Sequence, residues 1–236
     1  MKLRTIGLIG GITYHSTIDY YRLINEQVAA QLGGHTSAPL VMISLNFQEV
    51  RDRQMAEDWD KSGEIMAQHG RTLQAAGAEA VMICANLMHK VAPAVERAID
   101  VPLIHIVDAV AAAAGDRNLS SLGVMGAKWT MRDEFYRLRL AENGIRAVQA
   151  SDANIELTDQ IVFDELTQGI ILDSSRIKLL GVVDQLAQAG ADGVVLGCTE
   201  IPLILSQKDS PIPLIDSMQA HVDAAVQFIL GDSPRY

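Results

Sequence analysis

Short apolar runs alternate with longer amphipathic stretches along the whole chain. The apolar runs are rich in β-branched residues and are often bounded by glycine or proline, which is typical of buried strands. We predict strands at 5–10, 39–45, 80–84, 102–106, 121–126, 193–197 and 213–216. Helical patterns separate them, and the predicted helices include 16–31, 60–76, 108–115, 130–143, 174–189 and 217–230.

This alternation predicts an α/β fold with parallel sheets, because strands that are apolar throughout must be covered by helices on both faces. Such sheets bind ligands at the carboxyl ends of their strands, so the residues that directly follow each strand are the candidates for chemistry. The first apolar run is short and ends at Gly10 and Gly11. This favours a first strand over a signal peptide.

Three blocks of the sequence recur in the same order. The matches are TIGLIGG (5–11) with SLGVMGA (121–127), AAGAEAVMICAN (75–86) with QAGADGVVLGCT (188–199), and VPLIHIVDA (101–109) with IPLIDSMQA (212–220). Ordered matches indicate a duplicated unit rather than chance similarity among Leu, Val and Gly strands.

The duplication predicts two pseudo-symmetric lobes, each a parallel-sheet α/β sandwich, with the active site in a cleft between them. We expect the first lobe at 1–112 and the second at 113–215. The C-terminal helix, 216–236, should return to the first lobe, because the strand before it closes the second unit.

Composition narrows the classes of partner. The net charge of −10 argues against nucleic acid, which requires clustered Lys and Arg, and no segment has the length of a membrane span. Two cysteines 114 positions apart form neither a disulfide framework nor a metal motif. The six histidines show no i, i+4 pair, so we expect no metal. A reducing, cytoplasmic location fits this cysteine usage.

The repeat separates the two cysteines. Ile83 aligns with Leu196, so Cys84 aligns with Gly197 and Cys198 aligns with Ala85. Side chains alternate faces along a strand. If Cys198 points toward a ligand, Cys84 points away, and we interpret Cys84 as a buried apolar thiol.

Cys198 lies in GCTE, directly after a predicted strand. Gly197 removes a side chain beside the thiol, and Thr199 offers a hydroxyl. A helix starting just after would direct backbone N–H groups at the thiol and lower its pKa. The alternative is a second buried structural cysteine.

With these residues in place, the chain resembles the aspartate/glutamate racemase family, whose members racemise amino acids without pyridoxal phosphate. It looks most similar to the broad-specificity bacterial branch. The resemblance covers nearly the whole chain. It rests on GLIGG with STIDYYRLIN (7–25), AGAEAVMICANLMHKVA (76–92), GAKWTMRDEFY (126–136) and GADGVVLGCTEI (190–201).

The resemblance implies a two-base isomerase of amino-acid metabolism that needs no cofactor. A thiolate removes the α-proton from one face, and a thiol of the other lobe returns a proton to the opposite face. Donors to the α-carboxylate stabilise the charge that develops. The partner implied is an amino acid or dicarboxylate, and the assembly implied is a homodimer.

The sequence departs from this family at the first-lobe strand end. Where the family has Cys-Asn-Thr, or Thr in the first position, this chain has Ala85-Asn86-Leu87. Ala127 replaces a threonine, and His15 stands where an acidic residue is common. Alanine cannot carry a proton, so Cys198 is the surviving acid/base.

Three explanations remain for Ala85. The first is that Ala85 is an engineered knockout of the base, although this does not explain Leu87 and Ala127. Alternatively, the natural enzyme uses one thiol, with water or His15 serving the other face; arylmalonate decarboxylases of the wider superfamily resemble this, since they work with one cysteine and form the carbanion by loss of CO₂. The third explanation is that the protein binds an amino acid or dicarboxylate without turnover.

Other candidates surround these strand ends. Backbone N–H groups of the GLIGG turn are candidates for carboxylate binding, with a plain tight turn as the alternative, and Ser16 is predicted to cap the first helix. Two arginines, at 51 and 53, are predicted in a loop after the second strand, either near a distal carboxylate or simply exposed. His89 is as compatible with packing as with catalysis. The expected substrate contacts are Gly11, Thr13, Asn86, Thr130, Thr199, Glu200 and Arg51.

Overall fold

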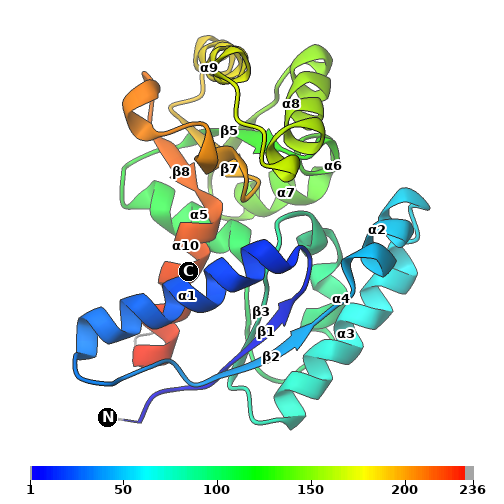
Figure 1. Ribbon diagram of the computed structural model, residues 1–236, viewed down its shortest axis with the longest axis vertical. Coiled ribbons are helices and arrows are strands. Elements are labelled where there is room, and N and C mark those ends of the chain that lie inside the picture. Colours follow the sequence, from blue (N-terminus) through cyan, green and yellow to red (C-terminus); the bar gives the residue numbers. More distant parts are fainter. Residues whose placement is uncertain (1, 232–236) are drawn as a thin grey trace. The chain divides into compact units, whose positions relative to one another are not determined.

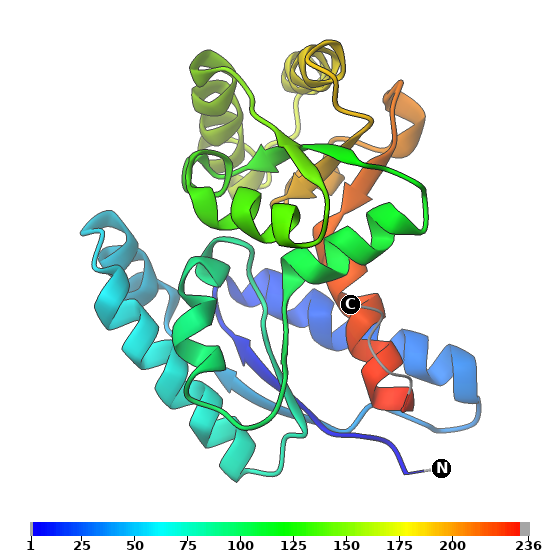
Figure 2. The same cartoon turned by 180° about the vertical axis from the view of Figure 1, so that it is seen from behind.

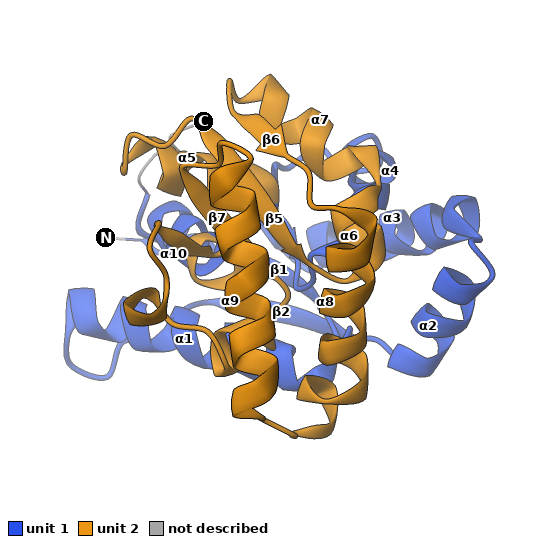
Figure 3. Cartoon of the chain, turned by 90° about the horizontal axis from the view of Figure 1, so that it is seen from above, with its two compact units in different colours: residues 1–106, 221–235 blue, residues 107–220, 236 orange. Residues whose placement is uncertain are grey.

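The computed structural model describes residues 2–231. The chain divides into two compact units, which Figure 3 colours separately. Unit 1 comprises the described residues of 1–106 and 221–235, and unit 2 comprises 107–220. The chain passes between the units within two helices, α5 (Ile106–Gly115) and α10 (Ser217–Leu230).

Unit 1 contains a four-stranded parallel sheet in the order β2-β1-β3-β4. The strands are β1 (Ile6–Gly10), β2 (Leu40–Ser44), β3 (Ala80–Ile83) and β4 (Leu103–Ile104). The helical segments are α1 (Tyr14–Leu32), α2 (Phe47–Met55), α3 (Trp59–Ala75), the 3₁₀ turn η1 (Leu87–Val91), α4 (Ala92–Glu96) and the unit 1 part of α10. The two central strands, β1 and β3, are buried along their whole length, as their continuous apolar runs predict.

Helices cover both faces of this sheet (Figures 1 and 2). A Cβ on Gly7 would meet Leu73 of α3, whereas one on Gly10 would meet Thr17 of α1, so these two helices lie on opposite faces. On the α1 face, Gln27 Nε2 donates to Asp223 of α10 over 2.7 Å. The C-terminal helix therefore packs beside α1 in unit 1.

Unit 2 repeats this arrangement with the sheet order β6-β5-β7-β8, again all parallel. The strands are β5 (Ser121–Gly126), β6 (Arg146–Val148), β7 (Gly193–Gly197) and β8 (Leu214–Asp216). The helical segments are α5, α6 (Lys128–Arg132), α7 (Glu134–Glu142), α8 (Asp152–Asp164), η2 (Leu166–Gln168), α9 (Asp173–Gln188), η3 (Ile201–Leu203) and η4 (Gln207–Asp209). Figure 3 shows α8 and α9 side by side, and Asn154 Nδ2 donates to Gln185 Oε1 between them over 2.6 Å.

The two sheets share the register that the sequence repeat predicts. Ile9 and Ile83 are Cα partners in unit 1, and their aligned residues Met125 and Leu196 are Cα partners in unit 2. The strand orders also correspond one to one. Two parallel four-stranded α/β sheets with flanking helices thus confirm the predicted fold class.

Three predicted features are wrong in detail. The predicted helix 130–143 is broken at Asp133, whose extended backbone (ψ 146°) separates α6 from α7. The segment after the second strand is the helix α2 rather than a loop, because the Asn46 side chain accepts from Gln48 N and begins it. Thr13, not Ser16, is the N-cap of α1, and the Ser16 hydroxyl donates to the Thr13 carbonyl.

The prediction also lacked the short helix α4, the strand β6 and the helix α8. Strand β6 has only three residues and begins with an exposed arginine, so it lacks the apolar run that marks the other strands. In residues 2–231 no helix is both long enough and apolar enough to cross a membrane.

Candidate functional site at the carboxyl end of β7

The carboxyl end of β7 carries the sequence GCTE on its exit loop. Gly197 is the last residue of the buried strand, and Cys198 follows it as a partly buried side chain that packs against the core of unit 2. Gly197 faces Thr130 after β5, since a Cβ there would lie 3.5 Å from Thr130 Cγ2. The sheet register therefore brings Thr130, a predicted site residue, close to the residue that precedes Cys198.

Glu200 reaches back to the thiol. Its Oε2 accepts hydrogen bonds from Cys198 Sγ at 2.9 Å and from Thr199 Oγ1 at 2.8 Å. The Thr199 hydroxyl fixes the carboxylate, and the carboxylate then holds the thiol proton. Glu200 was predicted as a substrate contact, which stays a prediction. In the structure its Oε2 forms a Cys–Glu pair.

The expectation that Cys198 has a lowered pKa is wrong. Burial raises the pKa of the thiol well above its usual value, and the negative charge and hydrogen bond of Glu200 raise it further. A hydrogen bond from the backbone N–H of Glu200 lowers the pKa of the thiol, but by less than the other contributions raise it. The short 3₁₀ turn η3 follows the loop, in place of the expected helix.

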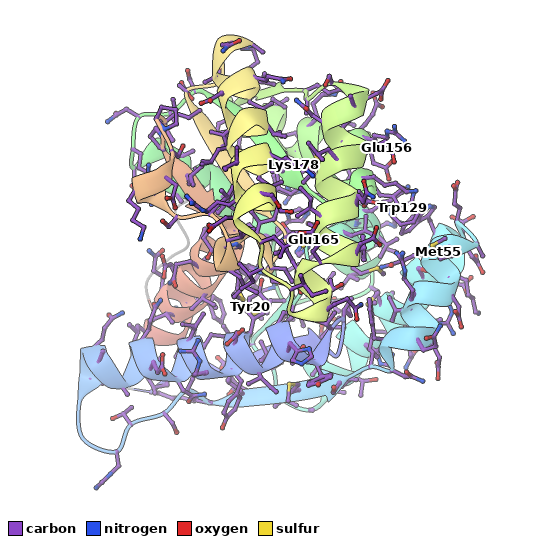
Figure 4. All side chains as sticks on the ribbon, turned by 45° about the horizontal axis from the view of Figure 1, so that its top comes forward. Tyr20, Met55, Trp129, Glu156, Glu165 and Lys178 are labelled. Carbon is purple, nitrogen blue, oxygen red and sulfur yellow. The ribbon has the colours of Figure 1, made fainter. Side chains whose placement is uncertain are left out.

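A second carboxylate, Asp159, belongs to the same strand edge and escaped the sequence analysis. Asp159 is on α8, and its Oδ1 accepts from the backbone N–H of Lys128 at the first residue of α6 over 2.8 Å. Its negative charge also contributes to the raised pKa of Cys198. Trp129 on α6 and Glu156 on α8 are labelled in Figure 4 and locate the two helices. No motif marks Asp159, because it lies inside a helix that was itself not predicted.

Thr130 is 2% exposed, and its Oγ1 has no hydrogen-bond partner within residues 2–231. The same holds for the hydroxyl of Tyr136, which is 1% exposed. Both residues line a cavity of about 30 Å³, which has room for about two water molecules. Buried hydroxyls need partners, and the predicted contact of Thr130 with substrate stays a prediction.

The carboxyl end of β3 in unit 1 is built differently. Cys84 is fully buried, and burial raises the pKa of its thiol, which confirms its interpretation as a buried apolar side chain. Ala85 is 9% exposed and packs in the core cluster of unit 1. Asn86 follows at 7% exposure and precedes η1.

A buried histidine holds this strand end. His89 is 1% exposed; its Nδ1 bonds the Ala85 carbonyl at 2.7 Å, and its Nε2 accepts from Ile106 N at 3.2 Å. Nδ1 is therefore the protonated nitrogen. His221, also fully buried, bonds the Ile104 carbonyl through Nε2 at 2.8 Å.

Tyr20, labelled in Figure 4, completes this group by bonding His221 Nδ1 over 3.0 Å. Both ring nitrogens of His89 and of His221 are thus engaged within the fold. The structure assigns His89 to packing and support of the strand end, the first of the two roles left open for it.

The glycine-rich turn after β1 also serves the fold. The N–H of Gly11 donates to Thr17 Oγ1 at 2.8 Å, and a Cβ on Gly11 would lie 2.2 Å from Leu45 N. With φ at +79°, the position requires glycine. These contacts favour the tight-turn interpretation over carboxylate binding by this N–H. Thr13, the neighbouring candidate, caps α1 and shares a 3.2 Å hydroxyl contact with Ser16.

The outer candidates lie on helices. Arg51 and Arg53 are both on α2, where Arg53 Nη1 donates to the Glu49 carbonyl at 2.8 Å. His15 is exposed on the first turn of α1.

Comparison with known proteins places this geometry in a family. A candidate Asp/Glu racemase from Yersinia pestis is 38% identical and superposes with a TM-score of 0.92, covering 97% of this chain and 100% of that one. An aspartate racemase homologue from Pyrococcus horikoshii OT3 is 30% identical with a TM-score of 0.83 over the same shares.

More distant matches extend the likeness. An uncharacterised protein from Pectobacterium carotovorum is 27% identical over 136 residues, which are 56% of this chain and 89% of that protein. Arylmalonate decarboxylase, at 18% identity and a TM-score of 0.54 over 97% of this chain and 94% of its own, shares the fold. The family described as Asp/Glu/Hydantoin racemase matches residues 9–225, and the chain belongs to this family.

Proposed function

We propose that this protein is a cofactor-independent amino-acid racemase or epimerase in which Cys198 transfers the α-proton. The observation that carries the proposal is the hydrogen bond from Cys198 Sγ to Glu200 Oε2 at the carboxyl end of β7. Family membership supports the reaction class, and the Cys–Glu pair supports the identity of the acid/base.

The Cys–Glu pair determines where each proton goes during the reaction. Glu200 takes the thiol proton and leaves a thiolate; the thiolate then takes the α-proton, and the C–H electron pair passes into the substrate α-carboxylate. In the reverse direction, Cys198 donates its proton to the α-carbon and recovers one from Glu200. Thr199 keeps the carboxylate oriented throughout, because it donates to the same oxygen.

Ala85 limits what the first repeat can contribute. It is aligned with Cys198 but carries no ionisable group. We therefore propose that Cys198 acts on one face of the substrate and that exchange of the α-proton is faster than inversion. Broad amino-acid specificity, independence of pyridoxal phosphate, a homodimer and a cytoplasmic location remain predictions of the sequence.

A one-thiol decarboxylase is the second candidate, because the raised pKa of Cys198 gives a thiol that is ready to donate a proton to a carbanion. The carboxylates of Glu200 and Asp159 act against this candidate. A malonate-type substrate brings two negative charges, whereas an amino acid brings an ammonium group that these carboxylates attract.

The test is α-proton exchange. Single enantiomers of amino acids are incubated with the protein in D₂O, and loss of the α-proton is followed by NMR. We expect exchange that falls by about 100-fold or more in Cys198→Ser, since a positioned acid/base contributes at least that factor. Undiminished exchange in Cys198→Ser would refute the assignment. Absence of exchange with every amino acid would leave decarboxylation or binding, and release of CO₂ from an arylmalonate would separate those two.

A further inference from the structure

A second carboxylate, Asp159, is held near the β5 and β7 strand ends by a hydrogen bond to the start of α6. Asp159 is on α8, far from GCTE in sequence, yet its Oδ1 bonds the backbone of Lys128 at 2.8 Å. Lys128 follows Gly126 by two residues, and Gly126 is the Cα partner of Gly197 in the β5–β7 ladder. The approach of these strands is close, since a Cβ on Gly126 would lie 2.7 Å from the Gly197 carbonyl oxygen. The register thus places Asp159 at the strand edge from which Cys198 emerges.

The charged groups that act on this thiol come from two elements. Glu200 belongs to the loop of Cys198 itself, and Asp159 comes from α8; both carboxylates favour the protonated thiol. On α6, the Lys128 ammonium lies over the Trp129 ring, 5.0 Å from its centroid. Asp159 is partly buried, so water screens its charge less than it would screen a fully exposed carboxylate.

We propose that Asp159 is a positioning residue that, with Glu200, keeps Cys198 in its protonated, proton-donating form until a substrate cation arrives. Asp159 contributes in two ways. Its hydrogen bond to Lys128 N fixes the start of α6 beside the β5 and β7 ends, and its charge opposes formation of the thiolate. This inference rests on the proposed function, because it gives the amino-acid ammonium group a role at the same site.

The consequence is electrostatic control of the thiol. A bound ammonium group would offset the carboxylates and make the thiolate easier to form, so the base would be generated only with a zwitterionic substrate in place. Anionic substrates without an ammonium group would leave Cys198 as a thiol. Asp159 and Glu200 would then select amino acids over simple carboxylic acids.

The experiment measures the thiol without any substrate. Alkylation of Cys198 by iodoacetamide is followed by peptide mass spectrometry between about pH 7 and 11 in the wild type, Asp159→Asn, Glu200→Gln and Asp152→Asn. Asparagine keeps an acceptor for Lys128 N but removes the charge. Asp152 lies on the same helix with its side chain 89% exposed, so it provides a matched control.

We expect the pH profile of Asp159→Asn to move about half a unit or more to lower pH, which raises the thiolate fraction at a fixed pH about threefold. A lower nucleophilicity of the more acidic thiol offsets part of that gain in rate. Glu200→Gln should move the profile further because Glu200 touches the sulfur. The Asp152→Asn profile should coincide with that of the wild type. An Asp159→Asn profile identical to that of Asp152→Asn, in a folded protein, would overturn the proposal.

If Asp159→Asn does not fold, the pair Asp159→Glu and Asp159→Gln replaces it, since these side chains match in size and differ in charge. The glutamine variant should then alkylate at lower pH than the glutamate variant, and equal profiles would overturn the proposal. The readout is independent of turnover. A shifted alkylation profile without α-proton exchange would support the role of Asp159 in controlling the protonation of Cys198 and would refute the proposed function. Exchange without a shifted profile would support the proposed function and refute the role of Asp159.

Discussion

The carboxyl ends of β3 and β7 occupy equivalent places in a duplicated scaffold but contain different chemistry. After β7, a partly buried thiol lies beside a carboxylate that accepts its proton. After β3, the aligned residue is Ala85, and its carbonyl is bonded by the buried His89. One strand end therefore has a thiol–carboxylate pair, and the other has a backbone carbonyl bonded by a buried histidine.

This difference shows which constraints the repeat has kept. Strand order and register are the same in both units, because both depend on apolar side chains that must remain covered. The residue just after the strand carries no such constraint, so positions 85 and 198 can differ in chemistry while the fold around them stays the same.

The largest expected effect comes from placing an acid/base at position 85, which would remove the chemical difference between the two strand ends. Ala85→Cys places a thiol at the position aligned with Cys198, and we expect the rate of inversion to rise by about 100-fold relative to the wild type. Chiral chromatography of the product measures inversion. Ala85→Val is the control, because it enlarges the side chain without adding a group that can carry a proton. Equal inversion rates in the two variants would show that position 85 does not face the α-carbon.

The supporting role of the unit 1 strand end is tested by His89→Ala. This change leaves the Ala85 carbonyl and the Ile106 N–H without their buried partner and opens a cavity. We expect a loss of about 2–3 kcal/mol in the free energy of unfolding, measured by urea denaturation. His35→Ala, at an exposed position, should cost less than about 0.5 kcal/mol. A His89→Ala protein as stable as the control would contradict the supporting role.

A smaller contrast lies at the amino ends of the same strands. Asp192 accepts from Ser120 N, Ser120 Oγ and Ser121 N, whereas the aligned Glu79 accepts from Thr5 N. Burial raises the pKa of Asp192, but these donors outweigh burial and leave the pKa below its usual value. The carboxylate therefore stabilises the fold above the pKa of about 4 that it has when unfolded, and this contribution is lost as the pH falls through the lower folded pKa.

We expect Asp192→Ala to lower the free energy of unfolding by about 1–2 kcal/mol at pH 7 and Glu79→Ala by about 0.5 kcal/mol. The cost of Asp192→Ala should shrink as the pH is lowered below about 4. Urea denaturation at several pH values measures both effects. A cost of Asp192→Ala that grows on acidification would contradict the sign derived from the pKa.

Much of the fold was predictable because the signals are local and repeated. Continuous apolar strands such as 193–197 indicated parallel sheets, and the internal alignment gave the equivalence of Ala85 and Cys198 before any coordinates. The break at Asp133 was missed because a single extended residue interrupts an otherwise helical pattern. The short strand β6 was missed because three residues carry little periodicity.

For the candidate site, the sequence predicted a residue but not its electrostatics. GCTE made Cys198 the candidate acid/base, whereas the direction of its pKa shift depends on burial and on the position of the Glu200 side chain. Asp159 bonds Lys128 N from a different helix, and no sequence spacing relates it to Cys198. A contact of this kind between distant segments becomes visible only when the chain is folded.

The central claim is that the acid/base of this protein resides on the β7 side alone. The most direct test follows one L-amino acid in D₂O and measures deuterium incorporation at the α-carbon and formation of the D-enantiomer in the same sample. We predict incorporation that clearly outpaces inversion, with most of the deuterium in the L-enantiomer. Inversion at the rate of incorporation would show that both faces are served by effective acids and would contradict the account.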